Sequence, residues 1–178
     1  MHVFFHVVGE QGAARDFPRT VFSQVDLTGM LRWVAQKSET EAAVLHEAIG
    51  ILGSTKTNVR GAPAGALRVL ANLRIGDCVL LVRNVAAEGE IPALAEVRFY
   101  RNQPLPYTSD WLWGESRYPV IFFFTTETLD LTWAEFDDHL NFNPNYRPPA
   151  HVQSIADDRL DGVGGAAALV RWVRQHAR

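Results

Sequence analysis

Two strongly apolar runs near the middle of the chain dominate its hydrophobic pattern. Residues 94–100 and 120–126 are rich in Val, Ile, Phe and Tyr, which favours buried or half-buried β-strands. The runs at residues 3–8 and 78–83 predict further buried strands, the second entered through a tight turn at residues 75–77. Between the two central runs lies a segment rich in Pro, Tyr and Trp, which we expect to be a loop. Its large rings are costly to leave in water, so they must pack or bind a partner.

Helix signals surround these strands. Asp26 is placed to cap a helix. Capping boxes, in which a Ser or Thr and a Glu three residues later satisfy each other's backbone amides, begin at Ser38 and Thr132. The predicted helices are residues 27–35, the stretch from Ser38 to a terminating Gly53, and residues 64–73, 133–140 and 166–176.

Three stretches lack a periodic pattern, and we expect them to be irregular. They are residues 9–25, the polar residues 53–63, and the Asn- and Pro-rich residues 141–149. Strands and helices do not alternate regularly along the chain. This order favours an α+β fold, with a small mixed or curled sheet and helices against it, over a doubly wound sheet.

Composition narrows the class of protein. The 178 residues suit one domain over residues 1–178, and no stretch approaches the ~20 apolar residues that span a bilayer. The N-terminal residues do not show the pattern of a signal peptide, so we expect a cytoplasmic protein. The single cysteine, Cys78, excludes an intramolecular disulfide and a multi-cysteine zinc site. Because the histidines are scattered and Asp157, Asp158 and Asp161 lack EF-hand spacing, we expect no metal and no cofactor.

The net charge of −3 means that a nucleic-acid binder of this sequence needs a local basic patch. Four sequence segments occur in an order that is typical of a known superfamily. Residues 73–81 combine a helix end, Gly-Asp and a strand; residues 93–97 read Ala-Leu-Ala-Glu-Val; residues 110–120 hold Asp-Trp-Leu-Trp-Gly and Tyr-Pro-Val; and residues 141–155 are Asn-rich. Together they resemble the PUA-like superfamily, and within it the EVE and YTH domains that bind modified bases.

The resemblance implies a curved mixed sheet or partial barrel of about five to six strands flanked by helices. It implies a non-catalytic reader of a modified, in particular methylated, base in DNA or RNA, with the base flipped into an aromatic cage. Such readers belong to modification-dependent restriction or RNA-modification systems, which implies a nuclease or ATPase partner in trans and no membrane. Residues 53–63 hold no aromatic counterpart of one YTH cage tryptophan.

The implied site draws on two sets of residues. Stacking on rings contributes roughly 1–3 kcal/mol per base, and amides or carboxylates can contact the base edge. The base-binding candidates are Trp111, Trp113, Asn58, Asp110, Tyr107 and Trp33. The phosphate-binding candidates are Lys56, Arg60, Arg101, Arg117 and Arg147. For Trp111 and Trp113, core packing is the alternative; Trp133 and Trp172 are expected in the core.

Two other functions stay open on the sequence. An ASCH-like ribonuclease of the same superfamily would use a Lys-rich motif, which Lys56 and Arg60 echo loosely and without its Glu. A small-molecule or protein-binding module could use the aromatic segment instead.

Overall fold

Eight α-helices and seven strands are present in residues 1–143, 145–149 and 151–178, the part of the chain that the computed structural model describes. The strands are β1 (Val3–Val7), β2 (Val25–Asp26), β3 (Lys56–Ala62), β4 (Cys78–Val82), β5 (Glu90–Tyr100), β6 (Val120–Thr132) and β7 (Val152–Ser154). The helices are α1 (Glu10–Thr20), α2 (Leu27–Val34), α3 (Glu39–Leu52), α4 (Ala66–Val69), α5 (Pro106–Trp113), α6 (Trp133–Leu140), α7 (Asp157–Gly162) and α8 (Ala166–Arg174).

Hydrogen bonds join the described strands in the order β2-β3-β6-β5-β4-β1-β7, a mixed sheet that confirms the α+β class. The expected five to six strands were too few, because β2 and β7 are only two and three residues long. The chain divides into two compact units: unit 1 is Met1–Arg15, Gly76–Glu96 and Thr126–Arg178, and unit 2 is Asp16–Ile75 and Val97–Thr125. The single domain over residues 1–178 remains a prediction.

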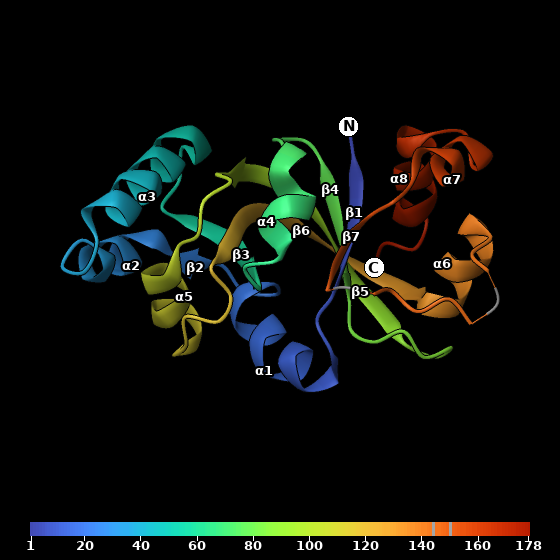
Figure 1. Ribbon diagram of the computed structural model, residues 1–178, viewed down its shortest axis with the longest axis horizontal. Coiled ribbons are helices and arrows are strands. Elements are labelled where there is room, and N and C mark those ends of the chain that lie inside the picture. Colours follow the sequence, from blue (N-terminus) through green and yellow to red (C-terminus); the bar gives the residue numbers. More distant parts are fainter. Residues whose placement is uncertain (144, 150) are drawn as a thin grey trace. The chain divides into compact units, whose positions relative to one another are not determined.

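Unit 1 is built around β1. This strand pairs in parallel with β4, from Val3 opposite Cys78 onward, and antiparallel with β7, while β4 pairs antiparallel with β5. Helices α6, α7 and α8 belong to this unit (Figure 1). Its core includes Trp133, 3% exposed, whose ring lies 5.6 Å from that of Phe5. Trp133 is therefore a core residue, as predicted, whereas Trp172 is half-buried.

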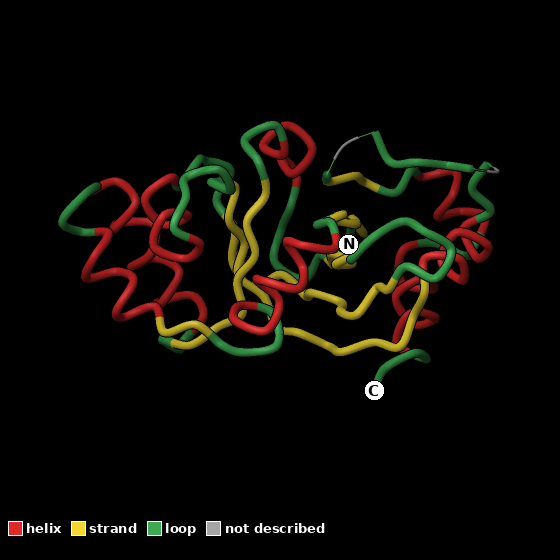
Figure 2. The backbone as a smooth tube through the Cα atoms, turned by 90° about the horizontal axis from the view of Figure 1, so that it is seen from below, coloured by secondary structure: helices red, strands yellow, loops and turns green. Residues whose placement is uncertain are grey.

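Unit 2 has its own apolar core. Strand β3 pairs antiparallel with β2 and with β6, in a register that places Asn58 opposite Phe124 and Ala62 opposite Val120. Helix α2 contacts both α3 and α5, and Figure 2 shows these helices (red) beside the strands of the unit (yellow). Leu45, on α3, is fully buried in this core.

Three predictions of irregular structure were wrong. Residues 9–25 hold α1, because Ala13 and Phe17, four residues apart, bury one face of a helix. Residues 53–63 hold β3, whose polar side chains find distant partners inside unit 2. The aromatic segment holds α5, which begins at Pro106, a residue suited to a first helical turn.

The other predicted helices and strands are present with small boundary shifts. Asp26 caps α2 by accepting from the Thr28 amide, Thr132 and Glu135 form the complete capping box of α6, and Gly53 ends α3 at φ +63°. None of the described helices has the length and apolarity that a membrane span requires.

Candidate functional site

The guanidinium of Arg60 lies inside unit 2, enclosed by aromatic rings. Its Cζ is 5.4 Å from the ring centroid of Trp113, 5.7 Å from that of Tyr118 and 6.0 Å from that of Phe17. Its Nη1 donates to Oδ2 of Asp16 at 3.0 Å, and the two side chains are 2% and 0% exposed. Ring faces attract the cation and the carboxylate neutralises it. Arg60 thus fills an aromatic cage itself, and this burial contradicts the surface phosphate contact predicted for it.

A glycine allows the cage to close. A Cβ built on Gly61 would lie 2.5 Å from the Tyr118 carbonyl oxygen and 2.6 Å from Cζ3 of Trp113. No side chain fits there, so the Trp113 indole packs directly on the backbone of β3. The rings of Trp113 and Tyr118 meet edge to face, 5.9 Å apart at 85°. This arrangement holds the two aromatic rings and the guanidinium in one fixed geometry.

Trp113 is 8% exposed, which places it mainly in the core rather than in an open slot. Its Nε1 is buried and has no hydrogen-bond partner among the described residues. An unsatisfied buried donor costs about 1–3 kcal/mol, and native proteins rarely leave one without a reason. The indole N–H is therefore an unsatisfied hydrogen-bond donor in an otherwise well-packed cluster.

A carboxylate from another helix positions α5. Glu41, on α3 and 4% exposed, accepts from the backbone amide of Tyr107 at 3.1 Å and from the amide and hydroxyl of Thr108, both at 2.9 Å. A negative charge at a helix N-terminus satisfies free amides and interacts favourably with the helix dipole. Glu41 therefore fixes the start of the helix that carries both central tryptophans.

Asn58 has a positioning role. Its Nδ2 donates to the carbonyls of Val21 at 2.7 Å and Ser23 at 3.1 Å, and the residue is 7% exposed. The amide nitrogen predicted to contact a base edge is thus committed to the backbone. The segment it holds presents Phe22, 46% exposed, whose ring meets that of Phe17 edge to face. The sequence analysis missed Phe22, which follows the buried Val21 and whose exposure no local pattern indicated.

The other base-binding candidates lie on two helices that contact each other. On α5, Trp111 and Asp110 are half-buried and Tyr107 is 43% exposed. On α2, Trp33 is half-buried, with Nζ of Lys37 5.6 Å from its ring centroid. The structure therefore brings the predicted aromatic residues into one unit, with Trp111 and Tyr107 more accessible than Trp113.

Among the exposed cations of unit 2 are Lys56, Arg117 and Arg19. Lys56 begins β3 and Arg117 precedes Tyr118. Arg19, which the sequence analysis missed, donates from Nη2 to a backbone carbonyl in the last turn of α5 at 3.3 Å, where the helix dipole favours a cation. Arg101 instead forms an ion pair with Glu47, so its charge is already matched.

Unit 1 contains the remaining phosphate candidate and the cysteine. Arg147 is exposed. Burial raises the pKa of the Cys78 thiol to about 11, so it is protonated and a poor nucleophile at neutral pH. The described residues contain no group of three or more His, Cys, Asp or Glu side chains that could hold a metal ion.

Comparison with known proteins adds one solved structure. No protein-family model matches the chain, and no curated protein matches its sequence. The chain superposes on the N-terminal domain of McrB from Thermococcus gammatolerans, solved bound to m5C DNA, with a TM-score of 0.64. The match covers 97% of this chain and 99% of the other at 16% identity. The TM-score and the coverage show that the two chains share a fold, and at 16% identity the match shows the fold alone.

Proposed function

We propose that this protein reads a modified base in DNA, with a methylated base as its ligand. The observation that carries the proposal is its fold, which matches over almost the full length of both chains that of a domain solved on m5C DNA. The burial of Arg60 against Asp16 also removes one group from the loosely matched ribonuclease motif, which favours binding over catalysis. We further propose an EVE/YTH-type PUA-like placement, a cytoplasmic location, and a nuclease or ATPase that acts in trans.

The proposed base-binding surface lies on α5 and the loop between α5 and β6. Trp111 and Tyr118 are half-buried, so each offers part of a ring to a ligand. The Tyr118 ring packs against Trp113 and Arg60, so the buried cluster holds it in place. A surface that is already ordered loses less conformational entropy when it binds. Stacking on such rings contributes roughly 1–3 kcal/mol per base.

Exposed cations of unit 2 support the same proposal. Lys56, Arg117 and Arg19 are exposed in unit 2 and would contact phosphates, which position a strand without selecting its sequence. These contacts would offset the few kcal/mol needed to flip a base from a duplex. These cations would supply the local basic patch that a nucleic-acid binder with a net charge of −3 needs.

Discrimination between methylated and unmodified bases comes from the methyl group. Burying one methyl group contributes about 0.8 kcal/mol, which corresponds to roughly a fourfold difference in Kd. The test is a fluorescence-anisotropy titration of short duplexes that differ in one methylated cytosine.

A pair of variants locates the selectivity. Trp111→Ala should reduce the ratio of the two Kd values to near one, because the stacking ring is lost. Trp172→Ala is the matched control, since Trp172 is also half-buried but lies in unit 1. Equal ratios in wild type and Trp111→Ala would reject this surface as the base-binding site.

A further inference from the structure

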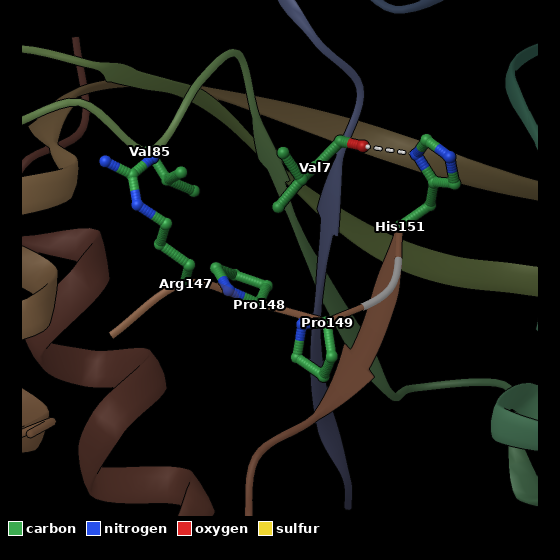
Figure 3. Close-up of a pocket in the computed structure, with 6 residues that line it drawn as sticks. All are labelled: Val7, Val85, Arg147, Pro148, Pro149 and His151. Atoms are coloured by element: carbon green, nitrogen blue, oxygen red, sulfur yellow. Dashed lines mark hydrogen bonds between the residues drawn. The ribbon is translucent and has the colours of Figure 1, made fainter. Parts of the chain in front are cut away.

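A cavity lies in unit 1, outside the aromatic cluster. It has a volume of about 350 Å³ and is lined by Val7, Val85, Arg147, Pro148, Pro149 and His151 (Figure 3). Cavities of roughly 300–1,000 Å³ are typical of small-molecule sites. Among the described lining side chains four are apolar, the other two are a guanidinium and an imidazole, and none is a carboxylate. This lining fits a ligand with a flat apolar body and a negative charge.

The cavity is formed before any ligand arrives. The Val7 amide donates to the His151 carbonyl at 2.7 Å, and the His151 ring Nδ1 lies 3.4 Å from the Val7 carbonyl oxygen. Strand pairing of β1 with β7 begins at the next residue. Two successive prolines restrict the backbone on the other side. The backbone around the cavity therefore loses little conformational entropy when a ligand binds, and the main ordering cost is that of the Arg147 side chain.

The two polar side chains of the cavity, Arg147 and His151, can each form further hydrogen bonds with a ligand. Arg147 is exposed and, within the described part of the chain, forms no ion pair or hydrogen bond. A carbonyl oxygen can only accept, so the His151 Nδ1 that faces it is the donor. This leaves Nε2 for a ligand. A guanidinium binds phosphate oxygens through two parallel hydrogen bonds, which gives it both affinity and a defined orientation.

We propose that this cavity binds a nucleoside monophosphate unit, with the base against the Val and Pro walls and the phosphate on Arg147. The unit comes either from a free nucleotide or from one link of a nucleic-acid strand; the second source rests on the proposed function. The cavity is thus a second ligand site, separate from the selective aromatic surface of unit 2.

The experiment is a titration of the full chain with adenosine 5′-monophosphate, followed by ¹H–¹⁵N NMR. Amide shifts should concentrate at Val7, Val85 and His151. Arg147→Gln should weaken binding roughly tenfold, the loss expected for a charged hydrogen-bonded contact. Arg171→Gln is the control, because Arg171 is an equally exposed arginine of unit 1 that lies on α8. Adenosine and inorganic phosphate should each bind at least several-fold more weakly than the nucleotide.

The outcomes separate the two sources and the two proposals. If Arg147→Gln weakens binding of an unmodified oligonucleotide and leaves the methylated-to-unmodified ratio unchanged, the ligand is a strand link. If only the free nucleotide loses affinity, the ligand is a free nucleotide. Shifts confined to other residues, equal behaviour of both arginine variants, or phosphate binding as tightly as the nucleotide would overturn the proposal. The methylated-to-unmodified ratio tests the proposed function independently.

Discussion

Replacing Asp16 tests the central cluster most sharply. Asp16→Asn keeps the side-chain shape but removes the charge that neutralises Arg60, whose side chain is 2% exposed. Breaking a buried ion pair by removing one partner costs about 3–5 kcal/mol, because it leaves an uncompensated buried charge. For a chain of 178 residues each kcal/mol lowers Tm by about 2–4 °C, which gives a fall of roughly 6–20 °C.

The control is an ion pair at the surface. Glu47→Gln removes the partner of Arg101, and these side chains are 41% and 45% exposed. Solvent screens such a pair, so its loss should cost about 0–1 kcal/mol. Urea unfolding followed by circular dichroism measures both variants on one scale.

A double variant separates charge from packing. Asp16→Leu combined with Arg60→Met replaces both partners by apolar side chains and should recover much of the stability lost in Asp16→Asn. The aromatic rings around Arg60 can pack against methionine as well. A loss in Asp16→Asn no larger than that in Glu47→Gln would refute the buried ion pair as the element that organises this cluster.

Three further predictions use other parts of the structure. Glu41→Ala should cost about 1–2 kcal/mol in urea unfolding and reduce base selectivity, because α5 loses its N-terminal acceptor; unchanged stability would contradict this role. Gly61→Ala should destabilise by about 1–3 kcal/mol through the clash with the aromatic cluster, whereas Gly65→Ala, with nothing within 4 Å of its Cβ, should be near neutral in the same assay. Burial raises the pKa of Cys78 to about 11, so the unfolded chain ionises first and stability should fall between about pH 9 and 11; Cys78→Ala should make this slope shallower, measured by urea unfolding against pH, while the raised pKa of Tyr100 still contributes above about pH 10.

Local signals predicted most of the regular structure. Thr132 and Glu135 form their capping box as the sequence indicates, because every group it needs lies within one turn. The box at Ser38 is different: Ser38 accepts from the Glu41 amide, but the Glu41 carboxylate binds α5 instead. Glu41 and Thr108 are 67 residues apart in the sequence, so a local pattern cannot predict that the carboxylate binds the Thr108 amide.

The same physics explains the missed strand β3. Its residues look like a polar loop because Asn58 and Arg60 are polar and Gly61 breaks regular patterns. Each is accounted for by a distant contact: Asn58 bonds the backbone after α1, Arg60 pairs with Asp16, and Gly61 receives the Trp113 ring. The sequence thus drew attention to Trp111, Trp113 and Tyr107 but not to Phe17 or Phe22, and long-range contacts decide which of these rings are accessible.

The most direct test of the account is the ratio of two dissociation constants for the wild-type chain. Duplexes identical except for one methylated cytosine compete for the protein at ~150 mM salt, where weak phosphate contacts are screened. The account predicts that the methylated duplex binds roughly fourfold tighter or better. Equal dissociation constants for the two duplexes would contradict it.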